Sequence, residues 1–392
     1  MANWICSQLS ARENYAIPRA LALRNALTRM YTDLWIDPST LIAKFIPNKS
    51  RFHPDLKEKK VTSFNSQLLP RQLGRKIGLR IASDDELYDH LVAIELKASR
   101  SQTENFFAYS YSSFESMPVA KSFGYRTVLG QINPGPAEAD LVTTAFASYK
   151  NGKYKATVPD QAYWEKWKTE IDASDVVIVN SEWSRDLLVK KAVEAKKIAV
   201  IPLAYNAGRD FGPRKFNRRF DHNTPLRLLY VGGVGIRKGF HILTEAMKMM
   251  KSMPVRLDVL GGLKGPKELL EDNGPNVQYH GHVGRGETNH FFETSDILIF
   301  PTLSDGYGLV QLEAQARKLP LIVSTNCARV IDHMKNGIVL NEVTPKTIVE
   351  AVGVIIDSPE LLPEFSHNSV AMKNFGLDRL ADNLVSLDRS AN

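Results

Sequence analysis

The chain has 392 residues, 43% of them hydrophobic and 24% charged, which is ordinary for a soluble globular protein and long enough to predict two domains. The net charge is +7 at pH 7, and no apolar run approaches the roughly 20 residues that a membrane-spanning helix needs. Because the first residues also lack the basic and apolar segments of a secretory signal, we expect a cytoplasmic protein.

The first expected elements are a strand at Asn3–Cys6 and a helix at Ser10–Arg29, joined by a short polar loop. Ser10, Arg12 and Glu13 lie in or beside this loop. Polar residues at the end of a strand carry function more often than core residues do, so these three are candidates for binding a ligand. The alternative is that they cap the helix and pair on the surface.

A second strand is predicted at Thr32–Ile36, and a basic segment follows it. Between Lys44 and Arg80 there are ten lysines and arginines against two acids, an excess larger than that of the whole chain. Apolar side chains are interleaved with these charges, namely Phe45, Phe52, Phe64 and Leu68. The segment suits docking on an anionic membrane surface or binding an anionic molecule, and a solvated loop is the alternative. Nucleic acid is not an expected partner, because no recognition motif accompanies the charge.

The chain then predicts a helix opened by Ser83–Glu86, a strand at Asn105–Tyr109, a helix at Phe114–Phe123 and a strand at Arg126–Gln131. We interpret the acids of Ser83–Glu86 as a helix start and not as a metal site. Acids stabilise a first helical turn, and serine with glutamate three residues later forms a capping box. Gln131 ends the last strand, where it can hydrogen-bond a ligand but cannot act as a base.

The first half of the chain closes with a helix and two strands. The helix is predicted at Gln161–Ile171, and the strands at Ser174–Ser181 and Ala199–Leu203. The aromatic side chains of the helix favour packing over sugar binding. Residues 206–225 show little periodicity, so we expect them to link two domains.

A glycine-rich turn opens the second half. Leu226–Val231 predicts a strand, Gly232–Gly239 forms the turn, and a helix continues to about Met250. This order holds phosphates in many proteins, because backbone N–H groups and the positive end of the helix dipole face the anion. Lys238 lies at the start of the helix, where a lysine alone is unfavourable by roughly 0.3–1 kcal/mol. A bound phosphate would account for it.

Metal ligands are sparse in the sequence. Strands are predicted at Arg256–Leu260 and Val277–Tyr279, and two histidines follow the second strand, one of them His282. A metal site would need a third ligand, and none is near in sequence. The two cysteines, Cys6 and Cys327, lie in or beside apolar runs, so we expect reduced core residues and no cysteine-based metal cluster.

A second glycine-containing turn, Ser304–Gly308, follows a buried strand at Asp296–Phe300 and precedes a helix and a strand at Leu321–Val323. Its glycines let backbone N–H groups approach a ligand. Asp305 and Glu313 are eight residues apart, so the loop can place both carboxylates on one side of a cavity. That cavity would lie at the carboxyl edge of the sheet, where open α/β sheets bind ligands.

This spacing of Asp305 and Glu313 around a Gly-Tyr-Gly turn resembles the donor-site motif of retaining glycosyltransferases of the GT-B fold, in family 4, the glycosyl transferases group 1. The resemblance is strongest from Leu226 to Leu340. It implies an α/β protein with two Rossmann-like parallel-sheet domains facing across a cleft and a C-terminal helix that crosses back. The implied parts are an acceptor domain at 1–205, a linker at 206–225, a nucleotide-sugar domain at 226–375 and the crossing helix at 376–392.

The resemblance also implies an activity and a set of site residues. A metal-independent hexosyltransferase without a cofactor would use a UDP-, GDP- or ADP-sugar and a glycan, lipid-linked or other hydroxyl acceptor. Such an enzyme of polysaccharide biosynthesis would be cytoplasmic and peripheral on the inner face of the membrane if the basic segment docks there. Lys238 would hold the diphosphate, Asp305 the sugar and Glu313 the ribose. The implied donor-binding residues are Gly232, Gly233, Arg237, His282, Gly306, Tyr307, Gly308 and Leu309, and the implied acceptor-side residues are Ser10, Arg12, Glu13 and Gln131.

Three departures from the family pattern leave other functions open. Asp305 replaces a glutamate, Gly233 replaces an arginine for which Arg237 is a candidate substitute, and Gln131 lies near the place of a histidine. A non-catalytic nucleotide-sugar-binding subunit would fit these losses. A sugar-nucleotide epimerase or a phosphorylase of the same fold would process the donor without an acceptor. A dinucleotide dehydrogenase is not expected, because the first turn lacks the third glycine of that fingerprint.

Overall fold

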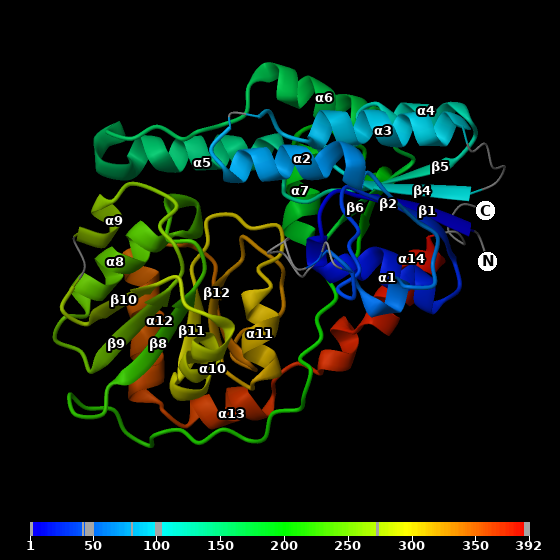
Figure 1. Cartoon of the computed structure of the whole chain (residues 1–392). Coiled ribbons are helices and arrows are strands. Elements are labelled where there is room, and N and C mark those ends of the chain that lie inside the picture. Colours follow the sequence, from blue (N-terminus) through cyan, green and yellow to red (C-terminus); the bar gives the residue numbers. More distant parts are fainter. Residues whose placement is uncertain are drawn as a thin grey trace.

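The computed structural model describes residues 3–40, 43, 51–79, 81–98, 104–271 and 274–387. These residues form two parallel sheets, each covered by helices on both faces (Figure 1). The strand order is β3-β2-β1-β4-β5-β6-β7 in the first sheet and β10-β9-β8-β11-β12-β13 in the second. The predicted pair of Rossmann-like, parallel-sheet domains is confirmed.

The first domain alternates strands and helices along the chain. Its strands are β1 (Asn3–Gln8), β2 (Leu27–Thr32), β3 (Val61–Ser63), β4 (Glu104–Tyr109), β5 (Arg126–Gly130), β6 (Val176–Val179) and β7 (Ile198–Val200). Its α-helices are α1 (Ala16–Leu23), α2 (Asn65–Lys76), α3 (Asp85–Ala98), α4 (Ser116–Ser122), α5 (Pro136–Ser148), α6 (Gln161–Ala173) and α7 (Glu182–Lys190).

The second domain repeats the same alternation. Its strands are β8 (Leu226–Val231), β9 (Val255–Leu260), β10 (Val277–Gly281), β11 (Ile297–Phe300), β12 (Leu321–Ser324) and β13 (Gly337–Leu340). The helices from here to the end are α8 (Phe240–Met249), α9 (Glu268–Glu271), α10 (Arg285–Thr294), α11 (Val310–Ala316), α12 (Pro345–Asp357), α13 (Leu361–His367) and α14 (Leu377–Ser386).

Continuous apolar runs form the centre of the second sheet. Every residue of β11 and of β12 is buried, because helices cover both faces of a parallel sheet and leave no solvated side. The same burial accounts for Cys6 on β1 and Cys327 after β12, which are buried and unbridged, as expected.

The beginning of the chain differs from its prediction. The sequence predicts a helix as far as Arg29 and a strand at Thr32–Ile36, and both predictions are wrong. The helix α1 ends at Leu23, because Asn25 has a φ of 53°, a left-handed conformation that a helix cannot continue. The chain then turns directly into β2, which pairs in parallel with β1.

Part of the basic segment belongs to the core. Phe64 and Leu68 are only 4% and 0% exposed, so the expectation that they face a membrane or an anionic molecule is wrong. Both pack into the first domain's core with Tyr31 and Tyr88, because they lie on the apolar face at the start of α2. Outside the described residues lie Lys44, Phe45, Lys49 and Arg80.

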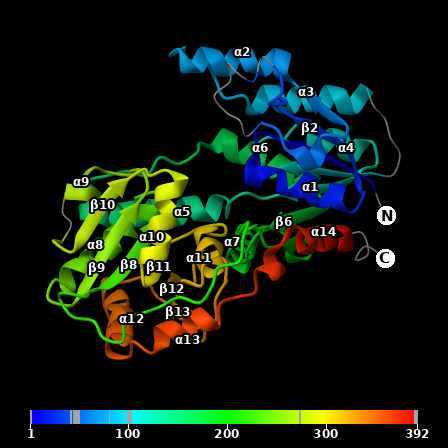
Figure 2. The ribbon, with the colours of Figure 1, turned by 60° about the horizontal axis from the view of Figure 1, so that its bottom comes forward.

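The last described helix returns to the first domain, as expected. Figure 2 shows α14 beside α1, far from the second sheet. Its inward side chains join the core around β1, namely Leu380, Ala381 and Leu384. Arg24 next to α1 forms ion pairs with Asp378 at 3.1 Å and with Asp382 at 2.9 Å. Both ends of the described chain therefore stabilise one domain.

Helix α5 joins the two domains. It begins in the first domain and extends over α8 and α9 of the second (Figure 1). Phe146 and Tyr149 at its far end pack against the core of the second domain. The helix consequently covers the turn between β8 and α8. Among the described residues, no helix combines the length and the apolar character that a bilayer-spanning helix requires.

Candidate functional site

Two glycine-containing turns meet at the carboxyl edge of the second sheet. The first joins β8 to α8 and the second joins β11 to α11, and β8 and β11 are neighbours. Gly239 of the first turn has a φ of 70°, and a Cβ at this position would lie 1.9 Å from the carbonyl oxygen of Pro301. Glycine is therefore needed for the two turns to pack against each other.

The second turn holds Asp305 in place. Gly308 has a φ of 82°, and a Cβ there would lie 2.6 Å from the ring of Phe300. The backbone N–H of Tyr307 donates to Oδ1 of Asp305 at 3.2 Å. The side chain of Tyr307 is buried beneath the turn. One carboxylate oxygen of Asp305 is thus used within the turn, and the other is available to the neighbouring turn.

That other oxygen, Oδ2 of Asp305, accepts a hydrogen bond from Nζ of Lys238. The two side chains are 18% and 17% exposed, so the ion pair is largely withdrawn from water. Burial, and after it the adjacent guanidinium of Arg237, lowers the pKa of Lys238 to about 7, and Cys327 and Glu138 offset part of that shift. The predicted meeting of Lys238 and Asp305 from separate turns is observed.

A cavity of about 650 Å³ lies between the two domains at this ion pair. It brings together most of the residues that the sequence singles out. From the second domain it is lined by Gly232, Gly233, Lys238, Asp305, Gly306, Tyr307, Gly308 and Leu309, and from the first domain by Ser10, Arg12 and Glu13.

The first-domain wall is the loop between β1 and α1, whose backbone is unusual. Glu13, Asn14 and Tyr15 all have positive φ, at 51°, 54° and 59°, which non-glycine residues seldom adopt. Tyr109 donates from its hydroxyl to Oε2 of Glu13 at 3.3 Å. Burial raises the pKa of Glu13, and the charge of Arg12 partly offsets that rise. The loop therefore presents the carboxyl group of Glu13 and the guanidinium of Arg12 to the cavity.

The start of helix α7 is hydrogen-bonded to the second turn, whose Gly306 lines the cavity. Ser181 and Ser184 at its start donate from their hydroxyls to the carbonyl oxygen of Gly306, at 2.6 and 3.3 Å. Trp183 donates from Nε1 to Oγ of Ser304 at 3.1 Å. These hydrogen bonds join the first domain to the second turn, so the position of the second turn depends on both domains.

Two lining residues with polar side chains are absent from the sequence-based candidates. Arg51 lines the cavity and pairs with Asp33 at 3.0 Å, and its only sequence signal is membership of the basic segment. Asn180 also lines the cavity. It directly follows β6, at the carboxyl edge of the first sheet where ligands bind in such folds, and that position could have identified it.

Gln131 is not among the lining residues of this cavity. Its side chain is only 3% exposed. Nε2 donates to the hydroxyl of Tyr111 at 3.0 Å, and Oε1 accepts from Nε1 of Trp167 at 3.0 Å. The amide thus organises the core beneath the cavity, and its neighbour Ile132 contributes to the lining instead.

Three other candidates are not among the residues that line the cavity. His282 is exposed after β10. Glu313 is half-buried in the first turn of α11, three residues after Val310, which does line the cavity. Arg237 lies between α5 and the second turn. Its Nη1 is 3.4 Å from Oε1 of Glu138 in α5 and 2.8 Å from the carbonyl oxygen of Ser304 in the second turn.

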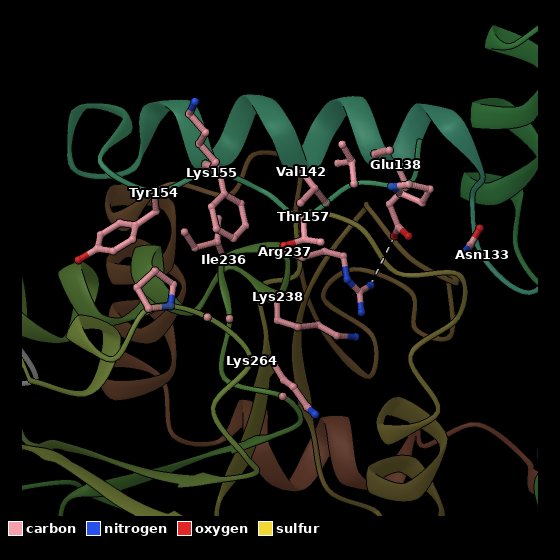
Figure 3. Close-up of a pocket in the computed structure, with 18 of the residues that line it drawn as sticks. Asn133, Glu138, Val142, Tyr154, Lys155, Thr157, Ile236, Arg237, Lys238 and Lys264 are labelled. Atoms are coloured by element: carbon pink, nitrogen blue, oxygen red, sulfur yellow. Dashed lines mark hydrogen bonds and ion pairs between the residues drawn. The ribbon is translucent and has the colours of Figure 1, made fainter. Parts of the chain in front are cut away.

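A second cavity, of about 840 Å³, is lined by residues of the first turn and of α5 (Figure 3). Helix α5 crosses above it, and Gly233 and Lys238 line both cavities. Its walls combine cations with aromatic rings, namely Lys155, Arg237 and Lys264 with Tyr154, Tyr163 and Trp164. The aromatic side chains of α6, expected to serve in packing, are thus partly turned toward a cavity.

The acids at the start of α3 are paired. Asp84 accepts from Nε of Arg71 at 2.8 Å and forms an ion pair with Arg75, which agrees with a structural role for this acidic stretch. Within the ranges that the structure describes, no group of three or more His, Cys, Asp or Glu side chains is arranged to hold a metal ion.

A comparison with known sequences finds similarity over part of the chain. The family model described as glycosyl transferases group 1 matches residues 225–358. CapM of Staphylococcus aureus, a capsular polysaccharide biosynthesis glycosyltransferase, is 25% identical over 216 residues, which cover 50% of this chain and 56% of CapM. A D-inositol 3-phosphate glycosyltransferase of Arthrobacter sp. (strain FB24) is 26% identical over 147 residues, covering 34% of this chain and 35% of that protein. The chain thus matches about half, or less, of the length of these relatives.

Comparison with solved structures covers both domains. Sucrose-phosphate synthase from Thermosynechococcus elongatus superposes with a TM-score of 0.65 at 15% identity, over 100% of this chain and 99% of that one. HepE of Anabaena, solved with UDP and glucose, superposes with a TM-score of 0.62 at 12% identity over 100% of both chains. The chain therefore has the GT-B fold, and its residues 225–358 match the glycosyl transferases group 1 model.

Proposed function

We propose that this protein is a retaining glycosyltransferase of family 4, which moves a hexose from a nucleotide-diphosphate sugar to a hydroxyl acceptor. The observation that carries the proposal is the ion pair of Lys238 and Asp305. It joins two glycine turns inside a cavity that both domains line. The GT-B fold and the match of residues 225–358 support the same function.

The donor diphosphate would lie against the first turn. Gly232 and Gly233 expose backbone to the cavity, and Lys238 adds a positive charge beside it. Negative charge accumulates on the diphosphate as the bond from the sugar carbon C1 to oxygen breaks. A fixed cation and backbone N–H groups aimed at that charge stabilise the transition state more than the bound substrate. They would therefore accelerate the reaction.

The sugar and the nucleoside would be held by the second turn. Asp305 would accept hydrogen bonds from sugar hydroxyls when the diphosphate takes over Lys238. The backbone of Gly306–Leu309 lines the cavity next to it and would position the sugar. Glu313, at the start of α11, would bind the ribose hydroxyls.

Retention would follow from attack on the face that the diphosphate leaves. The acceptor oxygen forms the new bond to C1 as the old bond breaks, and its proton passes to an oxygen of the departing diphosphate. This scheme needs no protein nucleophile. We also propose that it needs no metal ion, because Lys238 and the start of α8 supply the positive charge that a metal ion would otherwise provide.

The acceptor would approach from the loop between β1 and α1. Arg12, Glu13 and Arg51 line that side of the cavity and together offer hydrogen-bond donors and acceptors to a polyhydroxylated molecule. A glycan or a lipid-linked sugar fits this chemistry. The similarity to CapM favours polysaccharide biosynthesis, and the similarity to HepE, also solved with UDP-glucose, makes UDP-glucose the first donor to test.

Peripheral association with an anionic membrane surface is part of the proposal. Although Phe64 and Leu68 are buried, the C-terminal end of α2 leaves Leu73 43% exposed and Ile77 79% exposed. Apolar side chains next to a basic segment suit insertion at an anionic surface. Vesicles containing anionic lipid should retain the protein at low salt and release it at high salt, whereas neutral vesicles should not bind it.

The decisive experiment follows the release of nucleoside diphosphate from a panel of UDP-, GDP- and ADP-sugars with and without glycan acceptors. Acceptor-dependent release that is lost in Lys238→Ala and Glu313→Ala supports the transferase. Donor consumption without an acceptor would instead support an epimerase or phosphorylase. Tight nucleotide binding without turnover would support a binding subunit. No binding of any nucleotide would overturn the proposal.

A further inference from the structure

The cations of the first turn are already engaged in this structure. Lys238 pairs with Asp305. Arg237, the sequence-based candidate for a second cation, is directed to Glu138 and to the carbonyl oxygen of Ser304. A donor diphosphate placed against Gly233 would thus meet one cation from this turn, although charge develops along the whole diphosphate during the reaction.

A lysine from the next loop lies directly over this position. Lys264 belongs to the loop after β9, and its backbone N–H donates to the carbonyl oxygen of Val234 at 2.8 Å. Val234 in turn donates to the carbonyl oxygen of Gly262 at 2.9 Å. These reciprocal hydrogen bonds hold the loop against the first turn.

The side chain of Lys264 occupies the space that a side chain at position 233 would take. A Cβ built on Gly233 would lie 2.9 Å from Cγ of Lys264 and 3.6 Å from its Cβ. The absence of a side chain at Gly233 therefore allows the stem of Lys264 to cross the turn. Figure 3 shows Lys238 and Lys264 extending from adjacent turns toward the same side.

The ammonium group of Lys264 is available to a ligand. Lys264 is exposed and lines the second cavity, and among the described residues it has neither an ion pair nor a side-chain hydrogen bond. The two cavities share Gly233 and Lys238, which is where Lys264 crosses. A flexible, strongly hydrated ammonium on a stem held at its base suits contact with a phosphate.

We propose that Lys264 is the second cation for the donor diphosphate, reaching over Gly233 from the loop after β9. This inference rests on the proposed function, because it assumes a nucleoside diphosphate against the first turn. Lys238 and Lys264 would then hold the diphosphate from two sides, and Arg237 would join α5 to the second turn.

The test measures the affinity of purified protein for UDP, GDP and ADP by calorimetry. In Lys264→Gln, affinity for the nucleotide that binds wild-type protein should fall roughly tenfold, since a hydrogen bond to a charged group is lost. The dependence of affinity on salt should also weaken. The matched control is Lys267→Gln, three residues along the chain, which removes an exposed lysine paired with Glu271. It should bind like wild type.

A relocated charge distinguishes a phosphate contact from a structural role. Gly233 does not have the positive φ of Gly232, so the backbone accepts a side chain once Lys264 is shortened. Gly233→Arg combined with Lys264→Ala should restore affinity to within about threefold of wild type. Gly233→Arg alone should bind less well than the double variant, because its Cβ meets the lysine stem.

The outcomes separate the two proposals. Wild-type affinity in Lys264→Gln, or failure of Gly233→Arg to improve a folded Lys264→Ala protein, would overturn the role of Lys264 and leave the transferase in place. Absence of nucleotide binding by wild-type protein would overturn both. Melting temperatures measured without nucleotide verify that each variant is folded.

Discussion

Replacing Lys238 with methionine should reveal both functions of this side chain, as a partner of Asp305 without ligand and as a partner of the diphosphate with ligand. Breaking a buried ion pair costs about 3–5 kcal/mol when the remaining charge has no other partner. The two side chains here are 17% and 18% exposed, and Asp305 keeps the N–H of Tyr307. We therefore expect Lys238→Met to lose about 1–3 kcal/mol of the free energy of unfolding.

Urea unfolding followed by fluorescence measures that loss. Asp305→Asn removes the charge that Lys238→Met leaves unpaired and keeps the hydrogen bond from Tyr307. The double variant should consequently be less destabilised than the sum of the two single variants, by about 1 kcal/mol. Lys335→Met is the control, since Lys335 and Asp332 are 64% and 69% exposed, and exposed pairs contribute about 0–1 kcal/mol.

The same measurement with nucleoside diphosphate tests the second function. A ligand at about one hundred times its dissociation constant stabilises wild-type protein by about 2.7 kcal/mol. Lys238→Met should show little of this stabilisation at the same concentration. A variant as stable as wild type, and equally stabilised by nucleotide, would refute both the energetic importance of the ion pair and the position of the diphosphate.

Further predictions concern pH, the second turn and the membrane. Because burial lowers the pKa of Lys238 to about 7, the lysine is protonated below that pH, and nucleotide binding above it must take up a proton. Affinity should therefore fall as pH rises from 7 to 8.5, by up to about tenfold per pH unit, and Lys238→Arg should bind with little pH dependence because arginine stays charged. Gly308→Ala should lose about 1–2 kcal/mol or more of the free energy of unfolding, through its φ of 82° and the 2.6 Å approach to Phe300, whereas Gly353→Ala inside α12, where a Cβ meets nothing within 4 Å, should gain about 0.5–1 kcal/mol. Equal changes in the free energy of unfolding for Gly308→Ala and Gly353→Ala, measured by chemical denaturation, would contradict this account of the turn. Ile77→Asp should reduce co-sedimentation with anionic vesicles at unchanged stability, and unchanged co-sedimentation would exclude α2 as the docking surface.

The sequence predicts the second domain well because its signals are local. Leu226–Val231 is apolar except for Arg227, both turns contain glycines, and the strands lie where such runs occur. Lys238 and Asp305 follow strands that are neighbours in a sheet of this kind, so their meeting at its carboxyl edge follows from the order of the elements. Spacing along the chain is not sufficient for Glu313, which it places beside Asp305 and which does not line the cavity.

Features that depend on the two domains together could not be predicted in this way. Leu27–Thr32 alternates apolar and polar residues no more clearly than Thr32–Ile36 does, and only pairing with β1 decides which is the strand. The contacts of Ser181 with Gly306 and of Arg237 with Glu138 join segments more than 90 residues apart. The crossing of Lys264 over Gly233 likewise depends on the shape of two loops that the sequence does not specify.

A crystal structure of the protein with the nucleoside diphosphate that binds it tests the central claim most directly. We predict the diphosphate in the cavity between the domains, against the backbone of Gly232 and Gly233 and within hydrogen-bond distance of Nζ of Lys238. Phosphates bound away from Lys238, or at another surface of the molecule, would contradict the account.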